Sequence, residues 1–297
     1  MRFQVDGRAV YAYTGTRPLA ADQPLLVLLH GAQHDHSVWI MQARYLAHHG
    51  WSLLALDLPG HGRSEGPVLE SIEALAHWAC EAIASACTAA GLPAVPPTVV
   101  GGHSMGSLIA LEVGARAPEW LAGTLLAAIA VPMPVSDALL SAAKDDEARA
   151  FDMINVWSSN GINHRPGTPG PGFSTFMQNR RLMERQAPGV LHKDFSACNA
   201  YAAGPERAAT LRRPVLFLLA ARDMMTPPRR AAEAIAAARR GGAQVSVVTV
   251  PDAGHNLLAE RPDETLEAIR DWLGPIAAAT APHEQQARMT GATSQHE

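Results

Sequence analysis

The fold is decided by one stretch of the sequence, Thr98-Val99-Val100-Gly101-Gly102-His103-Ser104-Met105-Gly106. Its first half is apolar and predicts a short buried strand over 98–101, and a helix is predicted over 104–117. The pattern G-x-S-x-G therefore falls at a strand-to-helix junction, where small flanking residues let the backbone turn sharply and hold the Ser104 hydroxyl above the sheet. Without this context the pentapeptide would indicate only a glycine-rich turn with a capping serine. The junction instead indicates a nucleophile elbow with Ser104 at its tip.

Strands and helices alternate along the chain on both sides of this stretch. Continuous apolar runs predict further strands, buried on both faces, over 25–29, 52–56, 124–130, 215–220 and 245–250. Capping residues, prolines and glycines predict helices between them, over 71–91, 226–241 and 261–274. An Asp6-Gly7 turn between 3–5 and 9–13 predicts an antiparallel hairpin at the N-terminus. The alternation implies right-handed crossovers and an α/β fold with a mostly parallel, doubly wound sheet.

The alternation is interrupted over 132–210. This segment contains a proline- and glycine-rich loop over 165–172 and a charged helical stretch over 173–186. We interpret it as an inserted helical cap over one end of the sheet, which divides the core into 1–131 and 211–276. Residues 277–297 lack hydrophobic periodicity and are expected to form a disordered tail. Some cap residues suit either substrate contact or packing onto the core, so none is assigned a role: Trp157, Asn160, His164, Phe173 and Met177.

A serine hydroxyl needs a neighbouring base, oriented in turn by a carboxylate, to act as a nucleophile at neutral pH. Asp223 follows the strand predicted over 215–220, and His255 follows the strand predicted over 245–250. Because parallel strands end at the same edge of a sheet, both side chains are expected on the edge that carries Ser104. Asp137 and Asp252 are alternative carboxylates for His255. Asp223 is preferred because the strand before it and the helix start after it restrict its position.

The segment His30-Gly31-Ala32-Gln33 follows the strand predicted over 25–29. Its glycine permits the backbone to turn so that an amide faces the nucleophile. The N–H groups of Ala32 and Met105 would then form an oxyanion hole. A lone His-Gly pair is also compatible with an ordinary strand-to-loop junction.

Together these motifs resemble the α/β-hydrolase family in order and spacing over nearly the whole chain, from about 3 to 275. The motif Asp57-Leu58-Pro59-Gly60-His61-Gly62-Arg63-Ser64 is part of the resemblance, which implies that it shapes the floor of the pocket and that 132–210 is the cap. The pairing of Ala32 with Met105 is similar to the monoacylglycerol-lipase and carboxylesterase branch. The chain departs from the family pattern at Ser107, where a second glycine is frequent, and at Gln33-His34-Asp35-His36, which replaces a glycine-rich run.

The resemblance implies a serine hydrolase that cleaves a small carboxylic ester through an acyl-enzyme intermediate and needs no cofactor. Hydrolysis of thioesters, lactones or carbon–carbon bonds, acyl transfer and perhydrolysis would use the same three residues, Ser104, Asp223 and His255. A serine at the elbow argues against the dehalogenase and epoxide hydrolase branches, which resemble this fold but use aspartate there. A ligand-binding receptor of the same fold is the alternative outside enzymes.

His34-Asp35-His36 is the segment that could indicate a metal site, because alternate histidines can share one face. The metallo-hydrolase pattern H-x-H-x-D-H requires an Asp-His pair further on, where this chain has Val38-Trp39. No metal is therefore expected. Neither of the glycine-rich phosphate-binding spacings is present.

Composition sets the remaining bounds. The chain has 297 residues, 47% of them hydrophobic, and a net charge of −4 without a basic stripe, so nucleic-acid binding is not expected. Its apolar runs are too short for a membrane span, and its N-terminus does not have the pattern of a secretory signal. We expect a cytoplasmic protein with three reduced cysteines and a small-molecule substrate, and the oligomeric state stays open.

Overall fold

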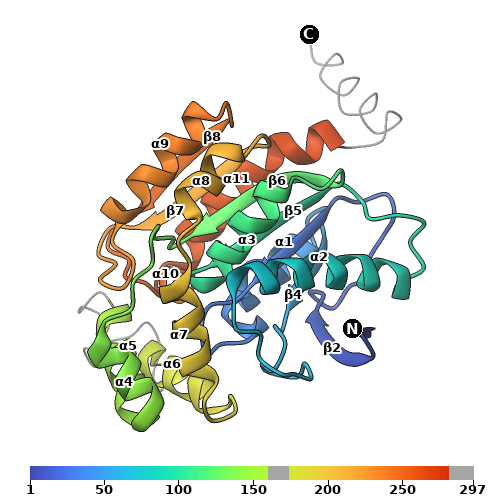
Figure 1. Ribbon diagram of the computed structural model, residues 1–297. Coiled ribbons are helices and arrows are strands. Elements are labelled where there is room, and N and C mark those ends of the chain that lie inside the picture. The colour runs from blue at the N-terminus through green and yellow to red at the C-terminus, as the bar shows by residue number, and fades with distance from the viewer. Residues whose placement is uncertain (160–173, 281–297) are drawn as a thin grey trace.

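The computed structural model describes residues 1–159 and 174–280, and within these ranges the strands form one eight-stranded sheet (Figure 1). The strand order across the sheet is β1-β2-β4-β3-β5-β6-β7-β8. The strands are β1 (Arg2–Val5), β2 (Arg8–Tyr13), β3 (Leu25–Leu29), β4 (Ser52–Leu56), β5 (Thr98–His103), β6 (Leu121–Ala127), β7 (Val215–Ala220) and β8 (Val245–Val250).

The strands from β3 to β8 are parallel to their neighbours. Strands β1 and β2 form an antiparallel hairpin, and β2 is antiparallel to β4. The hairpin turn has positive φ angles of 49° at Asp6 and 74° at Gly7, as the Asp-Gly signal requires. The prediction of a mostly parallel, doubly wound sheet with an N-terminal hairpin is confirmed.

Helices cover both faces of the sheet, because successive side chains of a strand point to opposite faces. On β3, Leu25, Val27 and Leu29 belong to one apolar cluster, while Leu26 and Leu28 belong to the other. The first face is covered by α2 (Ile72–Ala89), α3 (Met105–Arg116), α8 (Gly204–Thr210), η2 (Pro228–Ala231) and α9 (Ala232–Arg240). The second is covered by η1 (His36–Trp39), α1 (Ile40–Ala47), α10 (Leu257–Glu260) and α11 (Pro262–Thr280).

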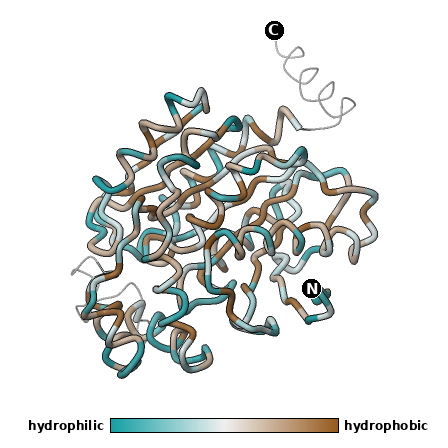
Figure 2. The backbone as a smooth tube through the Cα atoms, in the orientation of Figure 1, coloured by the Kyte–Doolittle hydropathy of each residue, from teal (hydrophilic) through white to brown (hydrophobic). Residues whose placement is uncertain are grey.

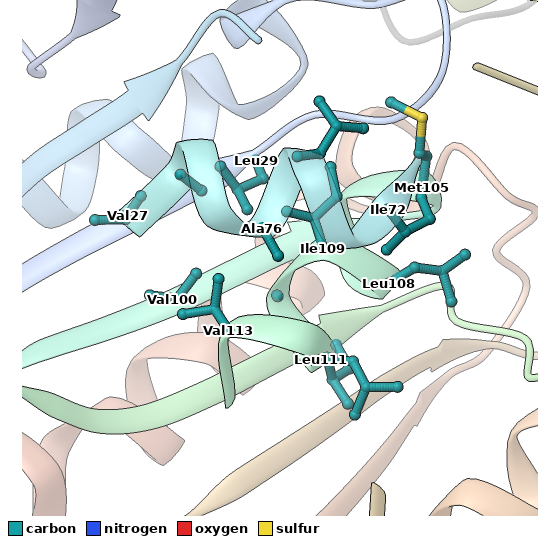
Figure 3. Packing of buried hydrophobic residues seen from close by; sticks show 14 of the residues in the cluster. Val27, Leu29, Ile72, Ala76, Val100, Met105, Leu108, Ile109, Leu111 and Val113 are labelled. Atoms are coloured by element: carbon teal, nitrogen blue, oxygen red, sulfur yellow. The ribbon is translucent and has the colours of Figure 1, made fainter. Parts of the chain in front are cut away.

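Figure 3 shows the packing of α2 and α3 side chains against residues of β3 and β5, including Val27 and Val100. The strands between the two helical layers are mainly brown in Figure 2, which marks hydrophobic residues. Double-sided burial explains why these strands are continuous apolar runs rather than alternating patterns.

A separate group of helices follows β6 and lies together at the lower left of Figure 1. They are α4 (Asp137–Asp145), α5 (Glu147–Ser158), α6 (Thr175–Glu184) and α7 (Val190–Ala200). Residues such as Leu139, Phe151 and Met183 give this group an apolar cluster of its own. Helix α8 then packs on the first face of the sheet, where Ala208 joins the main cluster. The predicted loop over 165–172 lies outside the described residues, as does the predicted tail except for its first four residues, 277–280, which belong to α11.

Four predicted element boundaries are wrong. Strand β6 lies over Leu121–Ala127 and not 124–130, because the chain leaves the sheet at Ala128, where φ is 50°. Strand β5 continues to His103. The helix predicted from residue 226 begins as the 3-10 turn η2 and becomes α-helical only at Ala232. Helix α11 continues through Pro275 to Thr280, because Ile276 packs into the second cluster.

The longest helices in the described ranges are α2, with 18 residues, and α11, with 19. None of the described helices combines the length and apolar character that crossing a membrane requires. Helix α2 begins as predicted at Ser71, whose hydroxyl accepts a hydrogen bond from Ala74 N–H. The three cysteines, Cys80, Cys87 and Cys198, are free thiols.

Candidate active site

Ser104 lies between β5 and α3 in a strained backbone conformation, with φ 55° and ψ −120°. Its N–H donates to the carbonyl oxygen of Ala127 on the neighbouring strand at 2.9 Å. A Cβ on Gly102 would overlap the carbonyl group of Gly106, and a Cβ on Gly106 would overlap the carbonyl oxygen of Leu29. Only glycine fits at either flank, so the tight turn that the pattern predicts has a direct steric reason.

Asp223 and His255 are in contact at the carboxyl ends of β7 and β8. Nδ1 of His255 lies 2.9 Å from Oδ2 of Asp223, and both side chains are buried. The other carboxylate oxygen, Oδ1, accepts hydrogen bonds from the backbone N–H groups of Met225 and Thr226 at 2.8 and 2.7 Å. The carboxylate is therefore held from two sides, as its place between a strand and a helix start implies.

Thr226 is a third member of this cluster, although its sequence context indicates only a helix start. Its Oγ1 lies 2.8 Å from Oδ2 of Asp223, 3.0 Å from Nδ1 of His255 and 2.9 Å from the carbonyl oxygen of Ala128. Burial opposes ionisation of Asp223, but the charge of His255 and the hydrogen bonds from His255 and Thr226 outweigh it and lower the carboxyl pKa. Asp223 is thus an anion at neutral pH.

His103, next to Ser104, holds the segment that carries His255. Its Nε2 donates to the carbonyl oxygen of His255 at 2.8 Å, and the two rings lie 4.9 Å apart. Burial lowers the pKa of His103 to about 3, so its ring is neutral under ordinary conditions. His103, the variable residue before Ser104 in the elbow motif, therefore helps to hold the backbone at His255. The motif alone does not indicate this role.

Ser104 and His255 come to the same sheet edge without a direct hydrogen bond. Within residues 1–159 and 174–280, neither Oγ of Ser104 nor Nε2 of His255 has a hydrogen-bond partner. Catalytic hydrogen bonds are often long before substrate binds. As far as residues 1–159 and 174–280 are concerned, no hydrogen bond competes with a reacting group for these two atoms.

The segment after β3 packs against the elbow. A Cβ on Gly31 would lie 3.2 Å from Cβ of Ser104, which shows how closely the two turns approach. In the described part of the chain, the N–H groups of Ala32 and Met105 donate to no other residue. Nδ1 of His30 lies 2.8 Å from the carbonyl oxygen of Gly31, and Leu58 N–H donates to Nε2 of His30 at 3.0 Å. Together these bonds orient the Gly31–Ala32 peptide.

A cavity of about 840 Å³ lies between the sheet edge and cap helix α6, and its lining includes His103 and Asn256, the chain neighbours of Ser104 and His255. His34 lines it as well, and Met177 and Leu182 of α6 form one wall. Trp157 instead packs against the apolar cluster of the cap. Asn160, His164 and Phe173 lie outside the described residues. Another cavity, of about 940 Å³, lies at the opposite edge of the sheet beside Trp120 and Trp272.

The histidine pair considered for a metal is separated in the structure. His34 Nδ1 lies 2.5 Å from the carbonyl oxygen of Ala32, whereas His36 groups with Asp35 and Asp57. The Asp57 carboxylate accepts hydrogen bonds from His36 N–H and Nδ1 and from Arg63 N–H, and Asp35 pairs with Arg185 at 2.8 Å. These hydrogen bonds account for the burial of both carboxylates.

The alternative carboxylates lie elsewhere. Asp137 is the first residue of cap helix α4, and Asp252 forms an ion pair with Arg222 on the surface. Nδ1 of His255 instead contacts Asp223 and Thr226. The pairing of Asp223 with His255 is the one that the tertiary structure brings about.

Comparisons with known proteins agree with this fold. One curated relative is the pimeloyl-[acyl-carrier protein] methyl ester esterase of Neisseria meningitidis, 27% identical over 199 residues, which cover 60% of this chain and 68% of that protein. Among solved structures, a thermophilic esterase matches with a TM-score of 0.75 at 22% identity, covering 93% of this chain and 97% of that one. An enol-lactonase from Burkholderia xenovorans matches with a TM-score of 0.76 at 20% identity, covering 92% and 99%.

These identities to solved structures are low and establish the fold alone. The chain covers 33%, 49% and 63% of the length of the first three curated relatives that it matches. A family profile described as "Alpha/beta hydrolase family" matches residues 26–268, which is most of the chain. The protein belongs to the alpha/beta hydrolase family.

Proposed function

We propose that the protein is a serine hydrolase that cleaves a small carboxylic ester through an acyl-enzyme intermediate. Ser104 Oγ attacks the carbonyl carbon while Nε2 of His255 takes its proton, and the alcohol then leaves with that proton. Water, activated by the same histidine, hydrolyses the acyl-serine. Asp223 orients His255 through Nδ1 and stabilises the imidazolium as it forms.

The observation that carries the proposal is the buried contact between Asp223 and His255. It lies at the same edge of the sheet as Ser104, whose backbone is strained. An ionised carboxylate on Nδ1 requires the proton of a neutral imidazole to reside on that nitrogen, which leaves a lone pair on Nε2 to accept the serine proton. Strained backbone conformations concentrate at functional sites, so the φ of 55° at Ser104 also favours a catalytic role.

The N–H groups of Ala32 and Met105 are proposed to bind the oxyanion of the tetrahedral intermediate. Each donor of this kind contributes about 2.7–4 kcal/mol to transition-state stabilisation. The support is that both amides lack partners in the described part of the chain and belong to the two turns that meet at Ser104.

The substrate is proposed to be a small ester with an apolar portion. The cavity beside the site has the volume usual for small ligands, and Val38, Met177 and Leu182 give it apolar walls. The curated relative named above acts on a methyl ester, and the matching structures include an esterase and a lactonase. Open-chain esters are therefore the first substrates to test, and lactones the second.

Residues 132–210 are proposed to form the cap that selects the substrate. Helices α4 to α7 have a separate apolar cluster, and α6 supplies one wall of the cavity. The end of this insertion is anchored to the body. Tyr201, which follows α7, and Arg207 of α8 both donate to the buried Glu112 of α3.

The test is labelling with a fluorophosphonate probe, combined with hydrolysis of short p-nitrophenyl esters, lactones and thioesters. The wild-type protein is expected to bind one probe per chain and release p-nitrophenolate in a burst. Ser104→Ala should abolish both signals, whereas Ser196→Ala, which changes an exposed serine on α7, should leave them unchanged.

Labelling that persists in Ser104→Ala would refute the assignment of the nucleophile. A wild-type protein that binds esters without burst or labelling would indicate a receptor instead of an enzyme. If the protein preferred lactones or thioesters to open-chain esters, the proposed substrate class would be wrong, but the roles of the three catalytic residues would stand.

A further inference from the structure

We propose that Asp194, on cap helix α7, is a positioning residue that holds the oxyanion loop, defined as residues 30–34, in its catalytic conformation. This inference rests on the proposed function, because it concerns the amide of Ala32. It gives the cap a direct part in transition-state stabilisation in addition to its part in forming the cavity.

Asp194 is fully buried and joins the cap to two loops of the body. Its Oδ2 accepts a hydrogen bond from the backbone N–H of Gln33 at 2.8 Å and lies 2.9 Å from Nε2 of His61. Its Oδ1 has no hydrogen-bond partner among the described residues. Both contacts fall on one oxygen of a carboxylate that α7 carries, so the body loops at Gln33 and His61 are tied to the cap at this point.

The contacts of His61 favour a protonated ring beside this carboxylate. Nδ1 of His61 lies 3.0 Å from the carbonyl oxygen of Pro59, which can only accept a hydrogen bond, so Nδ1 carries a proton. Nε2 faces the carboxylate of Asp194 and donates to it when that group is ionised. Burial opposes the charge, but the attraction of Asp194 and its hydrogen bond outweigh burial and raise the pKa of His61. Asp194 and His61 therefore form a buried, hydrogen-bonded contact that favours the protonated ring.

The peptide between Ala32 and Gln33 is held at both of its polar atoms. Asp194 accepts its N–H, and Nδ1 of His34 lies 2.5 Å from its carbonyl oxygen. Gln33 itself has a φ of 58°, which a residue with a Cβ adopts only when surrounding contacts favour it. Its side chain is tied to the cap as well, because Nε2 donates to the carbonyl oxygen of Met183 at 3.1 Å.

The preceding peptide carries the N–H of Ala32. His30 holds its carbonyl oxygen on Gly31, and in a trans peptide the N–H points away from the C=O. With the peptides on both sides of Ala32 held, the two backbone torsions of that residue have little freedom. The contacts made by Asp194 and His30 thus act together. In the proposed mechanism they direct the Ala32 N–H toward the position of the oxyanion.

The experiment compares Asp194→Ala and Asp194→Asn with the wild-type protein. Asp152→Asn is the matched control, because Asp152 is an exposed cap carboxylate that pairs with Arg180. Three quantities are measured with a p-nitrophenyl ester: kcat, KM and the inhibition constant of a trifluoromethyl ketone. The ketone forms a hemiketal oxyanion on the serine, so its affinity reports the oxyanion hole, whereas KM changes little when acylation and deacylation slow together and changes when substrate binding is altered.

Asp194→Ala is expected to lower kcat and ketone affinity by about 100-fold, the size of effect that a small misplacement of a catalytic group produces. KM should change by less than about threefold. Asp194→Asn should lower both by about tenfold, because its amide oxygen can still accept the Gln33 N–H but lacks the charge that attracts His61. Asp152→Asn should match the wild type.

Equal ketone affinity in wild type and Asp194→Asn, together with unchanged kcat, would overturn the inference. A lower melting temperature with an unchanged ratio of ketone affinity to KM would overturn it too, since that pattern belongs to a purely structural residue. If Asp194→Ala fails to fold, the comparison of Asp194→Asn with Asp152→Asn decides. A wild-type protein inert to both ester and fluorophosphonate would refute the proposed function, and the inference with it.

Discussion

Oδ2 of Asp223 lies 2.9 Å from Nδ1 of His255, although the two residues are 32 positions apart in the chain. Each residue follows a parallel strand, β7 or β8, and these strands are neighbours in the sheet. The contact is therefore produced by strand pairing, since parallel neighbours deliver the residues after their carboxyl ends to the same place.

This contact predicts a clear order among three carboxylate variants. Asp223→Asn should lower kcat by about 10⁴, because an amide at this position favours the wrong tautomer of His255. Asp137→Asn and Asp252→Asn should each lower kcat by less than about tenfold, since one lies at the start of α4 and the other pairs with Arg222. Steady-state hydrolysis of a p-nitrophenyl ester measures all three. If Asp223→Asn were active and Asp137→Asn inactive, the carboxylate that orients His255 would be Asp137 and not Asp223.

The glycines of the elbow predict a steric effect on stability. Gly102→Ala and Gly106→Ala should each lower the free energy of unfolding by more than about 3 kcal/mol, because the new Cβ would overlap backbone atoms that cannot move independently. Gly274→Ala is the control. It lies in α11 with no atom near the added Cβ and should raise the free energy of unfolding by about 0.5–1 kcal/mol. Urea unfolding followed by circular dichroism measures each value, and equal effects at the three sites would contradict the steric reason.

Buried neutral histidines predict that stability falls with pH in the acid range. Burial lowers the pKa of His30 to about 4 and of His103 to about 3, whereas an unfolded histidine has a pKa near 6.5. Between about pH 6 and 4.5 the unfolded chain therefore binds protons that the folded chain does not, and the free energy of unfolding decreases as pH falls. Each histidine contributes about 1.4 kcal/mol per pH unit. The raised pKa of His61 acts in the opposite sense, because the folded chain binds that proton more readily than the unfolded chain, and its contribution fades as the pH falls below the unfolded pKa.

Urea unfolding at several pH values between 6 and 4.5 tests this slope. His103→Gln should reduce it by about the contribution of one histidine. His77→Gln should leave it unchanged, since His77 is exposed and its partner Glu81 lies on the same helix. A stability that is flat across this range would show that the two rings become protonated without unfolding the chain.

The cavity wall predicts a change in substrate preference. Met177 lines the cavity from α6 and is half exposed, so Met177→Ala should lower kcat/KM for long acyl chains about tenfold more than for acetate esters. Val156→Ala, which removes a similarly exposed apolar side chain from α5 outside the cavity lining, is the matched control. A series of p-nitrophenyl esters from acetate to decanoate measures the difference. If Met177→Ala lowered kcat/KM equally for all chain lengths, Met177 would have no part in selecting the acyl chain.

The sequence alone was sufficient where the cause is local. Continuous apolar runs predicted the central strands, because burial on both faces removes any need for alternation. The glycines around Ser104 predicted the elbow, and at Gly102 the reason is local, because its Cβ would overlap the carbonyl group of Gly106. Helix ends were less accurate. Pro275 was expected to end α11, but the burial of Leu273 and Ile276 against the second face extends the helix through it.

Only the tertiary structure decided which distant groups meet. Asp194 and Gln33 are 161 positions apart, His61 and Asp194 are 133 apart, and His103 contacts the carbonyl oxygen of His255 across 152 residues. A hydrogen bond between such residues depends on how the cap and loops pack, and no spacing or periodicity encodes it. The sequence therefore determined the strands and the chemical types of the catalytic groups, whereas packing determined which side chains hold those groups in place.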